Sequence, residues 1–134
     1  APEGAIELFH GYTYSAHPIA VAAALATQKI YKDESLFERA NELSTYWQDG
    51  IHGLKGAPHV VDIRNSGLVG GIELDSRQGK IGQRAYDVFV KAYENGLLIR
   101  TTGDTIALSP PLIIEKGQID QIFDTLASVL KDID

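Results

Sequence analysis

One short stretch of this sequence suits the binding of an anion. Thr13 lies in GYTYSAHP, residues 11–18, directly before a run of small apolar residues that favours a helix. A hydroxyl and free backbone amides beside a helix N-terminus can hold a phosphate or a carboxylate. The stretch equally suits a plain turn in which Thr13 and Ser15 hydrogen-bond the local backbone. In that turn Tyr12 and Tyr14 would be half-buried aromatics. The residues alone leave both interpretations open.

Arg100 is a second candidate for anion binding. It closes a predicted short strand, Leu97–Arg100, and leads into the polar turn Thr102–Asp104. A guanidinium in that position can bind a carboxylate through two parallel hydrogen bonds. The alternative is a surface ion pair with Asp104, which would contribute little to stability. The spacing is compatible with either role.

Other polar residues do not form a catalytic or metal-binding pattern. No HxxxH pair is present, and no carboxylate completes a ligand set around the four histidines, which are His10, His17, His52 and His59. We therefore predict no metal site. Glu73 and Asp75 are two residues apart on a predicted strand and so face the same way, without an evident general-acid partner.

Eight elements are predicted to position these residues. Pro18 begins an Ala-rich helix that ends near Asp33, and Ser35 with Glu38 predicts a capping box for the next helix. The remaining elements are strands over 59–65 and 68–74, a helix from 81 closed by Asn95-Gly96, strands over 97–100 and 105–108, and a helix over 119–130. Between the first two strands, Gly67–Gly71 predicts a tight turn and a place where another backbone comes close.

This order of elements predicts the fold class. Strands that follow each other through short turns favour an antiparallel sheet, and the amphipathic helices would pack on one side of it. We therefore expect an α+β fold rather than a doubly wound parallel sheet.

Composition bounds the function. The 134 residues are 44% hydrophobic and 22% charged, as in ordinary globular proteins, and suffice for one domain with a core. The net charge of −6 disfavours nucleic acid or an anionic membrane as the main partner, and no apolar stretch could cross a bilayer. The absence of cysteine suits a reducing compartment, so we expect a cytoplasmic protein. Without an initiator Met or a signal peptide, the chain is expected to be cut from a longer one.

Several stretches together resemble the class III pyridoxal-phosphate aminotransferases. HGYTYSAHP at residues 10–18 resembles a signature of that family, in the form found in the branch that acts on ω-amino acids and amines with pyruvate. The stretches 64–74 and 96–111 are similar to the family's small domain. The resemblance implies the C-terminal small domain of a fold-type I pyridoxal-phosphate transferase. Residues 1–17 would be a remnant of the large cofactor-binding domain, and residues 18–134 a bridging helix and the small domain.

The resemblance also implies roles for three residues. Thr13 matches the threonine that hydrogen-bonds the cofactor phosphate of the neighbouring subunit, and Tyr12 would border that neighbouring active site. Arg100 matches the arginine that binds the substrate α-carboxylate and that, in some members, swings aside for substrates without one. A homodimer with shared active sites, pyridoxal 5'-phosphate, an amino donor such as β-alanine and a keto acid such as pyruvate are implied with them.

The chain departs from the family pattern in its lysines. The family's Schiff-base lysine has no counterpart among the seven lysines present, which are Lys29, Lys32, Lys55, Lys80, Lys91, Lys116 and Lys131. No catalytic residue is therefore assigned, and the chain alone is expected to be inactive. A non-catalytic binding or assembly module is the alternative, and a related member with a different amino donor is a third possibility. The Ile19–Ile30 helix is expected to expose apolar surface and promote self-association.

Overall fold

The structure of this chain is a computed structural model, and it describes residues 11–134. His10, the first residue of the signature stretch, and the rest of 1–10 lie outside the described residues. The chain divides into two compact units at Ser35 and Leu36. The predicted boundary between a large-domain remnant and the small domain, at residues 17 and 18, stays a prediction.

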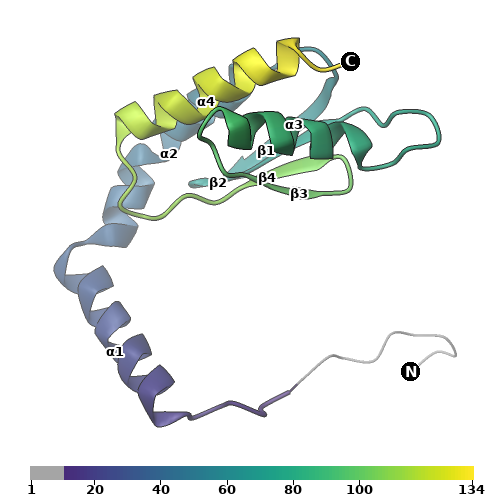
Figure 1. Cartoon of the computed structure of the whole chain (residues 1–134). Coiled ribbons are helices and arrows are strands. Elements are labelled where there is room, and N and C mark those ends of the chain that lie inside the picture. Colours follow the sequence, from purple (N-terminus) through teal and green to yellow (C-terminus); the bar gives the residue numbers. More distant parts are fainter. Residues whose placement is uncertain (1–10) are drawn as a thin grey trace, which may run out of the picture. The chain divides into compact units, whose positions relative to one another are not determined.

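In the first unit, the described residues form a turn followed by α1, Pro18–Asp33 (Figure 1). Proline occupies the first turn of the helix, where its missing N–H would have no partner, and Lys32 lies in the last turn, where the helix dipole favours a cation. The bounds agree with those predicted. No residue of α1 is buried in this chain, and its larger apolar side chains are exposed: Ile19, Val21, Leu25 and Ile30.

The second unit is built on a four-stranded antiparallel sheet. Its strands are β1 (Val60–Ser66), β2 (Val69–Leu74), β3 (Arg100–Thr102) and β4 (Thr105–Leu108), in the spatial order β1-β2-β4-β3. Alternate residues of β2 and β4 are buried, which gives each strand one face toward the core. The short β3 lies at the sheet edge and, among residues 11–134, pairs only with β4.

Three helices of this unit supply the other layer of the core. They are α2 (Leu36–His52), α3 (Gln83–Glu94) and α4 (Lys116–Lys131). Figure 1 shows α3 and α4 lying together on one side of the strands. The prediction of an α+β fold with an antiparallel sheet is confirmed.

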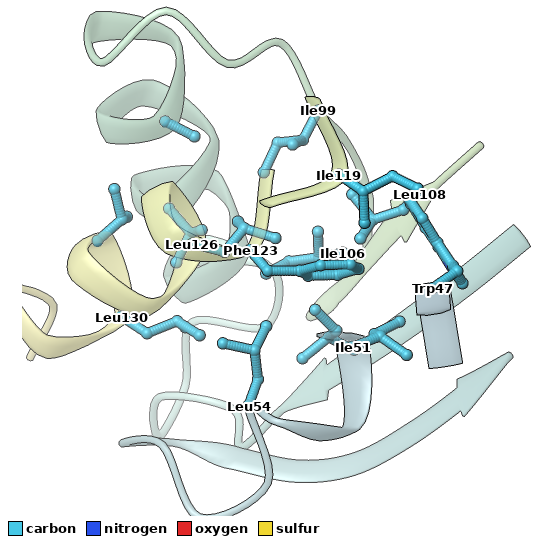
Figure 2. Close-up of a cluster of buried hydrophobic side chains, with 14 of the residues drawn as sticks. Trp47, Ile51, Leu54, Ile99, Ile106, Leu108, Ile119, Phe123, Leu126 and Leu130 are labelled. Atoms are coloured by element: carbon cyan, nitrogen blue, oxygen red, sulfur yellow. The ribbon is translucent and has the colours of Figure 1, made fainter. Parts of the chain in front are cut away.

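The core is centred on Trp47 of α2 and Phe123 of α4 (Figure 2). Their ring centroids are 5.0 Å apart with an interplanar angle of 62°, an edge-to-face arrangement. A Cβ added to Gly50 would lie 2.4 Å from Phe123, so the missing side chain lets α2 and α4 approach at this point. Ile106, Leu126 and Leu130 complete the same cluster, each almost fully buried.

The glycines after β1 differ in part from the prediction. Gly67 has φ +54, which confirms a tight turn. At Gly70, the prediction that a second backbone approaches is wrong: a Cβ there would lie 2.4 Å from the Cδ1 atom of Ile51 and 3.4 Å from the indole nitrogen of Trp47. Gly70 is therefore needed because two large side chains of α2 pack directly on the strand.

The helix starts also depart from the sequence patterns. Ser35 has φ +50 rather than the extended conformation of an N-cap residue, so the capping interpretation of Ser35 and Glu38 is wrong. Ile81 precedes α3 and is 84% exposed. A capping box is present instead at α4, where the Glu115 side chain accepts from the backbone of Gln118 and the Gln118 side chain accepts from the backbone N–H of Glu115, at 3.0 Å.

The strand predicted over Leu97–Arg100 is shifted, and Arg100 begins β3 rather than ending it. The two-residue turn of Gly103 and Asp104 fixes the register by pairing Thr102 with Thr105 and Arg100 with Ala107. Continuing the ladder backward would bring residues 97–99 opposite Leu108, Ser109 and Pro110, the first of the two prolines that follow β4. Proline has no N–H to donate to a ladder, so the pairing stops near Arg100.

Candidate anion-binding site

The turn that carries Thr13 is exposed in the first unit. The backbone N–H of Ser15 donates to the carbonyl of Tyr12 at 2.9 Å, which closes a turn around Thr13. Tyr12 is 70% exposed and Tyr14 is 86% exposed, so the interpretation of these rings as half-buried is wrong for this chain. The described residues of this unit contain no buried apolar surface against which they could pack.

The turn leads directly into the N-terminus of α1. His17 is the N-cap residue, and its side chain makes no capping hydrogen bond. Within residues 11–134, no partner takes up the hydroxyl of Thr13, which is exposed. A hydroxyl donor and helix-end amides that have no side-chain cap are the groups that a phosphate oxygen would need. The geometry is therefore compatible with the phosphate role that the resemblance implies.

Arg100 is exposed at the start of β3, in the second unit. Among the described residues, no carboxylate forms an ion pair with its guanidinium, and the predicted alternative of a pair with Asp104 is wrong. Asp104 is buried, and its Oδ2 atom accepts hydrogen bonds from the Ser76 hydroxyl at 2.6 Å and from the Gly82 N–H at 2.9 Å. These donors engage the carboxylate, which makes no ion pair with Arg100.

The surroundings of Asp104 favour its charged form. Burial acts to raise the pKa of this carboxyl, but hydrogen bonds from the backbone of Gly82 and the hydroxyl of Ser76 outweigh it, and the pKa lies below its usual value. Asp104 therefore remains a carboxylate near neutral pH and acts as an acceptor at the start of α3.

The sheet face opposite the helices carries a cross-strand row of four residues. Arg64 pairs with Gly71, Gly71 with Ala107, and Ala107 with Arg100. The two inner residues of the row are small, so no large side chain from β2 or β4 stands beside Arg100 in this row. A ligand could therefore approach the guanidinium over Ala107.

The arginine at the other end of the row is already paired. The Nη1 atom of Arg64 donates to Asp62 at 2.8 Å and to Glu73 at 2.9 Å, and these bonds raise the pKa of the guanidinium. Its side chain lies over Gly71, 3.6 Å from the position that a Cβ would take. Of the two arginines in the row, Arg100 is the one available to an external carboxylate.

A groove of about 780 Å³ lies beside Arg100, entirely within the second unit. Leu98, Arg100, Pro110 and Gln118 are among the residues that line it. Its size is typical of small-molecule sites, and its walls combine apolar side chains with a few polar groups. The sequence pointed to Arg100 but did not indicate Ala107 or Gly71, whose role becomes visible only through the strand register.

The other polar residues considered from the sequence are accounted for within the fold. Glu73 pairs with Arg64, whereas Asp75 lies beyond the end of β2 and accepts from Arg84 at 2.5 Å, so the two carboxylates do not act together. Within residues 11–134, no three His, Cys, Asp or Glu side chains form a group that could hold a metal ion. No helix of this part of the chain is long and apolar enough to cross a membrane.

Comparison with solved structures gives the class of protein. The structure matches the adenosylmethionine-8-amino-7-oxononanoate aminotransferase from Methanocaldococcus jannaschii with a TM-score of 0.83 and 33% identity, over 96% of this chain and 31% of that one. The fold of this chain is thus that of an aminotransferase domain.

The family follows from the sequence itself. Residues 2–130 match the family model of the class-III aminotransferases, and the chain belongs to that family. It is 58% identical to an omega-aminotransferase from Caulobacter vibrioides over 96% of its length, and 39% identical to a beta-alanine–pyruvate aminotransferase from Pseudomonas aeruginosa over 98%. The chain spans 29% and 30% of the lengths of these two relatives. The resemblance given by the sequence motifs is confirmed.

Proposed function

We propose that this chain is the carboxylate-binding part of a pyridoxal-phosphate aminotransferase that transfers an amino group from an ω-amino acid or an amine to pyruvate or a similar keto acid. The observation that carries the proposal is the unpaired guanidinium of Arg100 at the end of a row of small residues, beside a groove of suitable size. The names of the similar relatives support this class of substrates.

Arg100 is proposed to bind the carboxylate of the keto acid. Its planar guanidinium can donate two parallel hydrogen bonds to a carboxylate, which fixes both the position and the orientation of the substrate. Because its cross-strand neighbour Ala107 is small, no large side chain of β4 stands beside the guanidinium in this row, and the substrate can reach it there. Glu73 holds Arg64 in place and keeps that second cation from competing for the substrate.

Thr13 is proposed to hold the cofactor. In this proposal its hydroxyl donates to the phosphate of pyridoxal 5'-phosphate in a neighbouring subunit, and Tyr12 borders the same site. The exposed turn and the adjacent helix end fit the phosphate group of the cofactor. When bound, pyridoxal phosphate supplies an electron sink for the amino-group transfer.

The chain by itself is proposed to lack activity. The lysine to which the family attaches the cofactor is not found in it, so its residues can bind and orient the substrate but cannot move the proton. The exposed apolar side chains of α1 support assembly with further protein surface, and a homodimer with shared active sites is proposed as that assembly.

The proposal is tested in the polypeptide that contains this chain, loaded with pyridoxal phosphate. Arg100→Ala should raise the KM for pyruvate by roughly 10- to 100-fold, the value of a charge-assisted bidentate contact, and should leave turnover of an aldehyde acceptor nearly unchanged. Arg64→Gln is the matched control, since Arg64 lies in the same row but is already paired; its KM for pyruvate should stay within about twofold.

A second test concerns the cofactor. Thr13→Val should lower retention of pyridoxal phosphate, measured by absorbance between about 320 and 430 nm after dialysis, with Ser44→Ala on α2 as the control. A polypeptide that neither binds the cofactor nor transaminates would overturn the enzyme proposal and favour a non-catalytic binding or assembly module. Turnover by residues 1–134 alone would contradict the proposed inactivity of the chain.

A further inference from the structure

We propose that Asp104 is a positioning residue for Arg100: it fixes the β3–β4 hairpin to the start of α3 and thereby aims the guanidinium. This inference rests on the proposed function, and it assigns a role to a buried carboxylate that the substrate does not touch.

The hairpin needs an anchor because its own pairing is weak. β3 has three residues, lies at the sheet edge and, in the part of the chain that the structure describes, is bonded to β4 alone. Short edge strands of this kind open readily, since few hydrogen bonds hold them and water competes on the free side. Arg100 is the first residue of β3, so any shift of the hairpin changes the direction of its side chain.

Asp104 supplies that anchor from the turn. It follows Gly103, whose φ of +55 suits the first position of a two-residue turn. Its backbone carbonyl accepts from Leu74 at 2.9 Å, which ties the turn to the end of β2. Its side chain reaches in the other direction, to Ser76 and to the N–H of Gly82 at the start of α3.

The turn also packs closely on the N-terminus of α3. Gly82 has φ +82, and a Cβ added there would lie 3.5 Å from the carbonyl oxygen of Gly103. A carboxylate at this place satisfies a helix-end donor and interacts favourably with the helix dipole. One buried residue therefore links β2, through its backbone carbonyl, with the loop after β2 and the start of α3, through its side chain.

The same contacts keep Asp104 away from Arg100. Four residues apart on one hairpin, the two charges could form an ion pair if the carboxylate were free. Because Asp104 is buried with an exposed fraction of 8%, and its Oδ2 atom is held by two donors, the guanidinium stays available for a substrate. Asp104 thus both orients Arg100 and leaves it unpaired.

The test uses Asp104→Asn in the polypeptide that contains this chain, with pyridoxal phosphate bound. The amide keeps the size of the side chain but removes its charge, so the bonds from Ser76 and Gly82 are no longer charge-assisted. We expect the KM for pyruvate to rise at least about tenfold, because the Arg100 guanidinium would be displaced from its binding position. For an aldehyde acceptor, kcat and KM should each change by less than about twofold. Ser76→Ala, which removes one donor only, should give a smaller change of the same kind and serves if the asparagine variant does not fold.

Two controls separate positioning from loss of stability. Asp120→Asn removes the charge of another carboxylate that accepts from a hydroxyl, that of Tyr46 at 2.5 Å, in the helical layer. Leu43→Ala lowers the stability of the core through α2, which packs on α4 and β1. Neither should change the ratio of kcat/KM for pyruvate to that for the aldehyde.

The outcomes distinguish this inference from the proposed function. If the unmodified protein does not transaminate, the proposed function fails. If the unmodified protein does transaminate, the ratio of kcat/KM for pyruvate to that for the aldehyde should fall in Arg100→Ala. If that ratio is unchanged in Asp104→Asn and Ser76→Ala, as in the two controls, the positioning role of Asp104 is overturned. The positioning role is established if Asp104→Asn and Ser76→Ala both lose activity with pyruvate and keep their activity with the aldehyde.

Discussion

The helices α1 and α2 have nearly equal lengths, 16 and 17 residues, but opposite surroundings. No residue of α1 is buried in this chain, whereas α2 buries Leu36, Leu43, Trp47 and Ile51 along one stripe. The apolar residues of α1 are mostly alanines, so its helical form rests on intrinsic propensity and on the proline at its start. α2 contains poorer helix formers and is held by tertiary packing.

The difference shows what each helix does for the protein. α2 is a structural element of the unit that carries Arg100, and its stability belongs to that unit. α1 presents Ile19, Leu25 and Ile30 to solvent in this chain, with exposed fractions of 76%, 62% and 48%. Side chains of that size exposed along one helix are typical of surfaces that another protein surface covers.

The largest effect is expected from the centre of the core. Trp47→Ala should lower the free energy of unfolding by about 3–5 kcal/mol, because a fully buried indole that packs on Phe123 is replaced by a cavity. Urea unfolding followed by far-UV circular dichroism measures this. A decrease of less than about 1 kcal/mol in the free energy of unfolding would contradict the central position of α2 in the core.

A smaller effect is expected where α2 meets the sheet. Gly70→Ala should destabilise the second unit by about 1–3 kcal/mol, because the added methyl would lie 2.4 Å from the Cδ1 atom of Ile51. Gly117→Ala is the matched control: nothing lies within 4 Å of its Cβ position in α4, and alanine favours a helix. Equal unfolding midpoints for the two variants would refute the close packing of α2 on β2.

The second unit should also respond to acid through Asp104. Its pKa is lowered in the folded state, so the stability it contributes is present above the unfolded value of about 3.9 and is lost as the pH falls through the folded pKa. Between pH 7 and pH 3, Asp104→Asn should therefore lose less unfolding free energy than the unmodified chain. Urea midpoints at both pH values measure the difference, and parallel pH profiles would count against a charged Asp104.

The smallest effect is expected in α1. Leu25→Ser should change the unfolding free energy of the isolated chain by less than about 0.5 kcal/mol, because the side chain is already exposed. The same change should reduce self-association, measured by sedimentation velocity. Amide hydrogen exchange should be fast over 18–33 and slow in α2 and α4. Slow exchange in α1 of a monomeric chain would remove the contrast between the two helices.

Much of the fold was predictable because local signals and packing agree. The stripe of α2, the proline at the start of α1 and the glycine at 96, with φ +80, each act within one element, and all three are placed correctly. The start of β3 was predicted wrongly, because it depends on the register with β4 and on the proline that lies ten residues after Arg100. Ser35 fails as a cap for a related reason: the chain turns there through φ +50, which a side-chain pattern does not reveal.

The candidate site was predictable only in part. Residue type and motif pointed to Thr13 and Arg100, because a hydroxyl in a turn and a guanidinium at a strand end are visible in the sequence. The residues that leave the Arg100 guanidinium accessible and unpaired could not be identified from the sequence. Ala107 and Gly71 become its neighbours through strand register, and Asp104 is withdrawn from it by residues 76 and 82, more than twenty positions earlier in the chain.

The position of α4 has a consequence for synthesis on the ribosome. This helix follows all four strands along the chain, yet Ile119, Phe123 and Leu126 form a large part of the layer that covers them. Until it emerges, the apolar faces of β2 and β4 and one side of Trp47 remain open to water. Nascent chains of this region should therefore bind chaperones that recognise apolar surface, and release from them should coincide with the appearance of α4.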